Sequence, residues 1–203
     1  MEQRSDEWFT ARLGKVTASK VSDVVAKTKS GYGASRETYM TQLVLERITN
    51  TQTAFFSNAA MQWGTDQEPL ARAAYEAALD VLVDEEGFVP HPTIEMAGAS
   101  PDGLVDADGL VEIKCPNSAT HKKTLLSRKA DSQYVNQMMW QMACTGRMWC
   151  DFVSYDPRFP EHLQLFVTRV FRDDTLIAQL ESEVTTFLAE VNEEIEKLNN
   201  LKP

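Results

Sequence analysis

Two carboxylates and a lysine are spaced so that a short β-hairpin would bring them together. Asp102 stands in Ser100-Pro101-Asp102-Gly103, and Glu112 and Lys114 stand in the segment that follows. Between them Asp108-Gly109 is a strong turn signal for two antiparallel strands. Because side chains alternate along a strand, Glu112 and Lys114 should share one face while their neighbours enter a core. Paired carboxylates with a lysine are suited to binding Mg²⁺ and activating water for phosphodiester hydrolysis.

Two polar side chains on flanking helices are candidates for the same site. Glu68 belongs to an expected helix over residues 58–78, and Gln137 to an expected helix over residues 132–145. A polar residue on an apolar helix face usually has a hydrogen-bonding partner. Taken alone, however, Glu68 and Gln137 are more typical of ordinary surface or satisfied polar residues than of a site. The hairpin alone is equally compatible with an ordinary turn and an exposed strand.

The hydrophobic pattern predicts one α/β domain over residues 1–203, with a central mixed β-sheet flanked by helices. Tyr39, Leu43 and Ile48 should point inward from a helix, and residues 28–34 are typical of a basic loop. Expected helices cover residues 6–13, 35–50, 58–78, 117–127 and 132–145, with a short one after Thr17 and a long one from 173; expected strands cover 80–84, 87–90, 93–97, 103–106, 110–115, 148–155 and 163–170.

The formal charge of −10 is unfavourable for a protein that binds nucleic acid, but the charge is unevenly distributed. Residues 61–111 contain one Lys or Arg against eleven Asp and Glu, and this block includes the proposed carboxylates. Residues 1–60 and 112–172 are net basic, whereas the segment from 173 onward is acidic. Bound cations would offset the first acidic block, so nucleic acid would have to meet the two basic ones.

The three cysteines and the chain start bear on the cellular compartment. Cys115, Cys144 and Cys150 are odd in number and form no Cys-x-x-Cys pair, which favours reduced thiols over disulfides or a zinc site. No apolar run reaches the length of about 18 residues that a membrane-spanning helix needs. The first residues lack the apolar core of a secretion signal. We therefore expect a cytoplasmic protein.

Four motifs then occur in a fixed order along nearly the whole chain. With them the chain resembles the phage-lambda-type exonuclease family, also called YqaJ-type viral recombinases, within the PD-(D/E)xK nuclease superfamily. A lone PD…ExK pattern is weak, but four motifs in register are specific. The motifs are Trp8…Arg12-Leu13-Gly14…Thr17-Ala18-Ser19, Trp63-Gly64…Glu68, Ser100-Pro101-Asp102-Gly103…Glu112-Ile113-Lys114-Cys115-Pro116 and Tyr155-Asp156-Pro157-Arg158.

The resemblance implies a site for two Mg²⁺ ions, with Mn²⁺ as a substitute. In this interpretation Lys114 orients the attacking water and stabilises developing charge, and Gln137 assists it. Two cations would stabilise the attacking and leaving oxygens. The implied metal ligands are Asp102, Glu112, the main-chain carbonyl of Ile113 and Glu68.

The resemblance also implies a pocket for the 5′-phosphate of a DNA end, formed by Arg12, Thr17, Ser19 and Ser100. An arginine fork with hydroxyl groups suits a terminal phosphate. Taken alone, these residues are more typical of a helix-end arginine, two caps and a turn serine than of a phosphate pocket. Met61 aligns with an apolar wedge that splits terminal base pairs, although an ordinary core methionine is an equal interpretation. Arg36, Lys122 and Lys123 are weaker candidates for the DNA backbone.

The expected activity is Mg²⁺-dependent 5′-to-3′ degradation of one strand of duplex DNA, which leaves a 3′ overhang for annealing-type recombination. The family implies a ring-shaped homotrimer around DNA, a single-strand annealing protein as partner, and a phage or prophage origin in a bacterial host. Two alternatives stay open. One is a restriction-like or structure-selective PD-(D/E)xK endonuclease, and the other is a non-catalytic DNA-binding recombination module.

Overall fold

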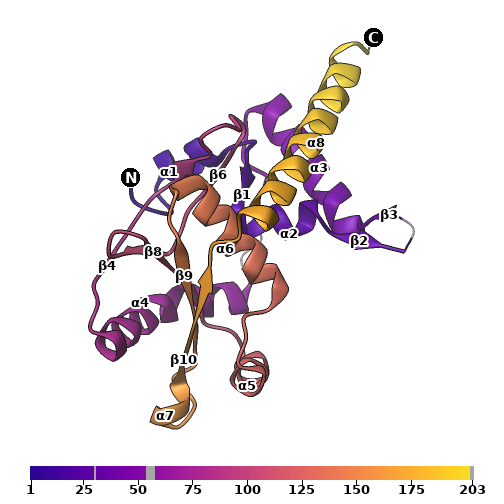
Figure 1. The fold of residues 1–203 in the computed structure, drawn as a ribbon. Coiled ribbons are helices and arrows are strands. Elements are labelled where there is room, and N and C mark those ends of the chain that lie inside the picture. Colours follow the sequence, from indigo (N-terminus) through magenta and orange to yellow (C-terminus); the bar gives the residue numbers. More distant parts are fainter. Residues whose placement is uncertain (30, 54–57, 202–203) are drawn as a thin grey trace.

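A five-stranded mixed sheet forms the centre of the protein, in the strand order β10-β9-β8-β7-β4. The structure is a computed structural model and describes residues 1–29, 31–53 and 58–201 (Figure 1). Strand β8 is central, because it pairs in parallel with β9 and antiparallel with β7. The strands of this sheet are β4 (Val83–Asp84), β7 (Gly103–Val105), β8 (Gly109–Lys114), β9 (Trp149–Tyr155) and β10 (Leu165–Phe171).

Two smaller sheets accompany the central one. The first has the order β1-β6-β5 and joins the segment after the first helix to the segment before β7. The second is the two-stranded pair β2-β3. Their strands are β1 (Val16–Thr17), β5 (Val89–Pro90), β6 (Ala97–Ala99), β2 (Lys27–Thr28) and β3 (Gly31–Tyr32).

Helices cover both faces of the central sheet (Figure 1). Helix α4 (Ala59–Leu79) packs against β8, β9 and β10 on one face, and α6 (Ser132–Thr145) packs against β9 on the other. Helix α8 (Asp174–Asn199) crosses α3 (Ala34–Thr49) and extends towards the C-terminus. The remaining helical segments are α1 (Asp6–Arg12), a 3₁₀ turn η1 (Ala18–Lys20), α2 (Val21–Val24), α5 (Ser118–Ser127) and α7 (Glu161–Gln164).

Local sequence signals explain where the site-bearing helices start. Asn58, Asn117 and Asp131 each accept a hydrogen bond from a backbone N–H in the first turn of α4, α5 and α6. Such caps satisfy donors that have no partner within the helix. Gly146 ends α6 with a φ of 73°, a left-handed conformation that glycine adopts without strain. The caps therefore fix where Gln137 lies relative to β8.

The predicted fold class is confirmed, with several local corrections. Residues 28–34 were expected as a loop but contain part of the β2-β3 pair, and of the strand expected over 93–97 only Ala97 belongs to a strand, β6. The strands expected over 80–84 and 163–170 begin later, at Val83 and Leu165. Ile48 was expected inward but is exposed near the end of α3. Glu112 lies on the opposite face from Ile113 as predicted, yet it is fully buried because α6 covers that face of the sheet.

Two leucines on α3 provide a matched test of its packing. Leu43 is buried against α8 and the core, whereas Leu45 is 48% exposed. We expect Leu43→Ala to lower the free energy of unfolding by about 2–5 kcal/mol, because it removes buried apolar surface and leaves a cavity. Leu45→Ala should change it by less than about 0.5 kcal/mol. Urea unfolding measures both, and equal losses would contradict this orientation of α3.

Candidate active site

One deep cleft gathers most of the predicted site residues, with a volume of about 910 Å³. It lies where the start of α4, the end of β8 and the segment from α1 to η1 meet, and Tyr134 of α6 contributes to its wall. The predicted residues that line it are Arg12, Thr17, Ser19, Met61, Glu68, Asp102, Ile113 and Lys114. The topology thus brings together residues more than 100 positions apart in the sequence.

Glu112 is a fully buried carboxylate behind this cleft. Gln137 Nε2 donates to its Oε1 at 2.7 Å, and Gln141 Nε2 donates to its Oε2 at 2.6 Å. Both glutamines lie on α6, one turn apart, so a single helix supplies two donors to one carboxylate. Burying a charge is costly unless it is paired and hydrogen-bonded. The α6 glutamines therefore meet part of that requirement.

Lys114 supplies the counter-charge. Its ammonium forms an ion pair with Glu112 Oε1 and lies 5.3 Å from the centre of the Tyr134 ring. Burial alone would lower the pKa of Lys114, but the nearby Glu112 and Asp102 carboxylates together raise it above its ordinary value. In the absence of other cations the lysine is therefore held charged at neutral pH.

Asp102 lies beside Glu112, immediately before β7. Its Oδ2 accepts a hydrogen bond of 2.7 Å from the backbone N–H of Ile113, which ties the start of β7 to β8. Burial raises the pKa of Asp102 well above its ordinary value, and repulsion from Glu112 and Glu68 raises it further. Lys114 and the Ile113 N–H act in the opposite direction. This cluster thus contains more negative charge than its lysine compensates.

Glu68 reaches the cleft from α4 and is held by two arginines. Arg4 Nη2 lies 3.0 Å from Glu68 Oε2, and Arg72 Nη2 lies 3.2 Å from Oε1. Arg4 has a φ of 69°, which is uncommon for a residue other than glycine. Gln3 anchors this segment by donating to the carbonyls of Glu86 and Pro101.

The donor set fits a divalent cation. Asp102, Glu112, Glu68 and the Ile113 carbonyl offer the hard oxygen ligands that Mg²⁺ prefers, and burial together with repulsion from Glu112 and Glu68 raises the pKa of Asp102. No three His, Cys, Asp or Glu side chains within the described ranges form a ready-made metal cage. Mg²⁺ is commonly bound by one or two carboxylates together with water and substrate phosphates. Such a partial site is therefore consistent with cation binding completed by a substrate.

Arg12 and Ser100 meet on another wall of the cleft. Arg12 Nη1 donates to Ser100 Oγ at 3.0 Å, and Trp8 Nε1 donates to the same oxygen at 2.9 Å. The guanidinium also lies 4.0 Å from the centre of the Trp8 ring. Burial lowers the pKa of Arg12 to about 10, so the side chain is still charged at neutral pH. In the described part of the chain Arg12 forms no ion pair, which leaves its charge available for an anion.

The other predicted pocket residues lie in the same cleft in different environments. The Thr17 side chain is buried, and its backbone N–H donates to Tyr39 Oη at 3.2 Å, whereas Ser19 is exposed. Met61 is 40% exposed on the first turn of α4. This exposure excludes the interpretation of Met61 as an ordinary core methionine.

The candidate backbone contacts lie elsewhere. Arg36 is buried in α3, where it pairs with Glu190 and lies 3.9 Å from the centre of the Tyr32 ring. It is therefore engaged with α8 and does not line the cleft, which removes the basis for proposing it as a DNA contact. Lys122 and Lys123 are exposed on α5, outside the cleft lining.

Several cleft residues were absent from the predicted site. Arg4, Lys15, Lys20 and Tyr134 line the cleft, and Gln141 lies directly behind it. Gln141 carried a readable signal, because it is a glutamine inside an apolar helix one turn after Gln137. The other four show no local pattern, since only long-range packing brings them to the cleft.

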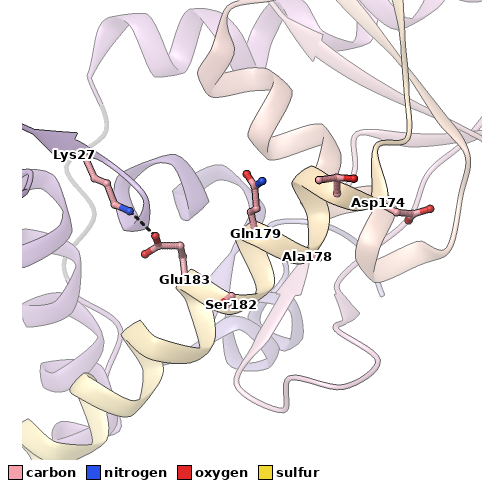
Figure 2. Close-up of a pocket in the computed structure, with 7 residues that line it drawn as sticks. Lys27, Asp174, Ala178, Gln179, Ser182 and Glu183 are labelled. Atoms are coloured by element: carbon pink, nitrogen blue, oxygen red, sulfur yellow. Dashed lines mark hydrogen bonds and ion pairs between the residues drawn. The ribbon is translucent and has the colours of Figure 1, made fainter.

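A second hollow lies along the start of α8, where the view in Figure 2 shows the side chains spread over one helix face. Lys27 reaches it from β2 but pairs with Glu183 at 2.7 Å, and Tyr32 also donates to Glu183. These contacts fasten the β2-β3 pair to α8. None of the candidate catalytic groups lies here. Its lining residues are Lys27, Asp174, Thr175, Ala178, Gln179, Ser182 and Glu183.

Comparison with known proteins agrees with this architecture. The family model of the YqaJ-like viral recombinase domain matches residues 7–148, which include the hairpin, Glu68 and all of α6. The chain belongs to the YqaJ-like viral recombinase domain family. No curated protein matches it significantly.

Solved structures show which proteins this YqaJ-family chain is similar to over nearly its whole length. An alkaline exonuclease from Laribacter hongkongensis, LHK-Exo, is 55% identical with a TM-score of 0.91, and the match covers 96% of both chains. The structure of LHK-Exo in complex with dAMP matches at 56% identity and a TM-score of 0.91, again over 96% of both chains. A phage-related exonuclease from Haemophilus somnus 129PT is 14% identical with a TM-score of 0.75, over 91% of this chain and 96% of that one. That last likeness concerns the fold alone.

The structure also bears on the expectations for the cysteines and for membrane-spanning helices. All three cysteines are buried, and none of them forms a disulfide with another. Within the described ranges, no helix combines the length and apolar character that crossing a membrane requires.

The charge of Asp102 gives a testable consequence. Because its pKa is raised in the folded state, Asp102 destabilises the metal-free fold fully above that raised pKa, and the penalty decreases as pH falls and disappears below the ordinary pKa of an aspartate. We expect Asp102→Asn to raise the melting temperature in EDTA at neutral pH, by about 2–4 °C for each kcal/mol of repulsion removed. The gain should shrink towards acid pH, as thermal melts at several pH values would show.

The matched control is Asp108→Asn, an exposed carboxylate in the turn of the same hairpin. It should leave the melting temperature almost unchanged across the same pH range. A loss of stability in Asp102→Asn, or an equal gain in Asp108→Asn, would contradict the proposed charge crowding.

Proposed function

We propose that the protein is a Mg²⁺-dependent exonuclease that degrades one strand of double-stranded DNA in the 5′-to-3′ direction. The observation that supports this proposal most strongly is the composition of one cleft. Its walls carry Asp102 and Lys114, with the buried Glu112 directly behind them, and also Arg12, which forms no ion pair among the described residues. A hydrolytic centre and an anion site within one cleft suit an enzyme that binds the terminal phosphate near the bond it cleaves.

Bound divalent cations would supply Lewis-acid stabilisation of the phosphate and of the water that attacks it. The chain's own residues supply the positioning. Asp102, Glu112 and the Ile113 carbonyl would hold the cations, with Glu68 as a further acidic residue. Lys114 would orient the attacking water and stabilise negative charge on the phosphate, and Gln137 would support it from α6.

The cleft wall that carries Arg12 and Ser100 is proposed to select the DNA end. Arg12 and Ser100 would bind the 5′-phosphate, with Thr17 and Ser19 nearby. A guanidinium forms strong, directional hydrogen bonds to phosphate oxygens. Each cleavage would produce a new 5′-phosphate, so the same pocket would favour the next step along the strand. Met61, which is exposed on the first turn of α4, would separate the terminal base pairs.

The related structures support the proposal of an exonuclease. LHK-Exo is described as an alkaline exonuclease and has been solved with dAMP. A nucleoside monophosphate is the product expected from sequential removal of nucleotides. We extend the proposal to a 3′ overhang used in annealing-type recombination, a single-strand annealing partner and a ring-shaped trimer. A ring would tolerate an acidic exterior, since only its channel needs positive charge.

Digestion of three substrates tests this function. Linear duplex with 5′-phosphate ends, linear duplex with 5′-hydroxyl ends and covalently closed circular DNA are incubated with Mg²⁺ or with EDTA. We expect mononucleotides only from linear DNA, only with Mg²⁺, and fastest from phosphorylated ends. Labels placed at each terminus report which strand is lost. Linearisation of the circle would instead indicate an endonuclease, and binding without cleavage would indicate a non-catalytic module.

The phosphate pocket is tested by Arg12→Ala. Hydrogen bonds to charged groups contribute about 1.5–3 kcal/mol, so the preference for phosphorylated over hydroxyl ends should fall by about 10–100-fold. Initial rates on the two linear substrates give the ratio directly. Lys15→Ala provides the control, because Lys15 also lines the cleft but contacts neither Trp8 nor Ser100. It should weaken DNA binding at moderate salt without changing the ratio, whereas an unchanged ratio in Arg12→Ala would refute the pocket.

A further inference from the structure

The two oxygens of the Glu112 carboxylate have different partners. Oε1 receives the Lys114 ammonium and Gln137 Nε2, and Oε2 receives Gln141 Nε2. Lys114 lines the cleft with 27% of its side chain exposed, whereas Gln141 is fully buried. Oε1 therefore lies on the cleft side of the carboxylate, and Oε2 lies on the interior side.

Gln141 donates to Glu112 at the cost of leaving its own amide oxygen without a partner among the described residues. Its Oε1 is buried and has no hydrogen-bond partner among the described residues, although a buried unsatisfied acceptor is costly. Rotating the amide would not relieve this, because an ionised carboxylate accepts hydrogen bonds and cannot donate one. The orientation of Gln141 is thus dictated by Glu112 Oε2 alone.

Glu112 itself has no exposed surface and is not part of the cleft wall. A cation entering the cleft can reach this carboxylate only if a group on its cleft side gives way. Lys114 and Gln137 are the groups on that side, and Lys114 carries the charge that a cation would replace.

We propose that Gln141 is a positioning residue that holds Glu112 permanently through Oε2, while Lys114 and Gln137 occupy Oε1 only until a divalent cation replaces them. This inference rests on the proposed function and assigns separate tasks to two glutamines on one helix. Gln141 keeps the carboxylate orientated, so that one oxygen is offered to the cation. Lys114 neutralises Glu112 before cation binding, and its release from Oε1 makes its ammonium available to water and phosphate.

Cation affinity distinguishes the two tasks without any substrate. Mn²⁺ is titrated calorimetrically into the EDTA-treated, dialysed full-length protein in the absence of DNA. We expect Gln141→Met to weaken Mn²⁺ binding by about 10–100-fold, the usual effect of losing a hydrogen bond that orientates a metal ligand. Gln137→Met should bind Mn²⁺ as tightly as the wild type or more tightly, because it removes a competitor for Oε1. Gln133→Met, at an exposed position of the same helix, should change nothing.

A double-mutant cycle separates positioning from general damage to the fold. In a Glu112→Gln background, Gln141→Met should cause no further loss of Mn²⁺ affinity, since the carboxylate it orientates is gone. An additive loss would mean that Gln141 acts through the fold and would overturn the proposal. If Gln141→Met does not fold, Gln141→Asn replaces it, because the shorter amide cannot reach Oε2 from the same backbone position.

Three outcomes overturn the inference. Wild-type affinity in Gln141→Met removes the permanent anchor, and equal weakening in Gln137→Met removes the separation of tasks. The third is the additive loss in the cycle. Each leaves the proposed function intact as long as the wild type binds Mn²⁺ and digests linear DNA. Absence of Mn²⁺ binding by the wild type without DNA would overturn the inference, and the DNA digestion assay decides the function separately.

Discussion

A carboxylate buried in the central strand of the sheet is the constraint on which this site depends. Glu112 is in the middle of β8, with β7 and β9 on either side and helices over both faces. A charge in such a position is tolerated only with nearly complete compensation. Lys114, Gln137 and Gln141 provide it through three separate contacts. Loss of any one would leave part of a buried charge unpaired.

This requirement explains why the surrounding elements meet where they do. The β7-β8 hairpin brings Asp102 against the backbone of Ile113, and α6 delivers two amides from successive turns. Helix α4 adds Glu68 from the opposite face of the sheet, where Arg4 and Arg72 hold it in place. The excess of negative charge that results is not a defect of the fold. It is the property that would draw a divalent cation into the cleft.

Much of this could be predicted from the sequence where the signal is local. The Asp108-Gly109 turn and the alternation of side chains placed Glu112 and Lys114 on one face of a hairpin, and apolar periodicity placed Gln137 on a helix. The burial of Glu112 was not predictable in this way, because it depends on α6, which follows later in the chain and packs over that face. Arg36 shows the same limitation. Its charge suggested a contact with the DNA backbone, but the packing of α3 against α8 buries it beside Glu190.

The residues that line the cleft show which positions local sequence patterns cannot predict. Arg4 reaches Glu68 because Gln3 binds the carbonyls of Glu86 and Pro101, and no spacing rule joins the start of the chain to those positions. Arg12 was found only through a motif, since a helix-end arginine is common. Its approach to Ser100 and Trp8, without an ion pair among the described residues, gives that motif a physical basis as an anion site.

Anomalous diffraction from crystals of the full-length protein soaked with Mn²⁺ tests the central claim most directly, because it locates the cation and the side chains together. We expect an anomalous peak between the carboxylates of Asp102 and Glu112, with Gln141 still bonded to Oε2 and the Lys114 ammonium moved away from Oε1. A peak at this position with the Lys114–Glu112 contact intact would contradict the exchange. Mn²⁺ bound only outside the cleft would contradict the assignment of the metal site itself.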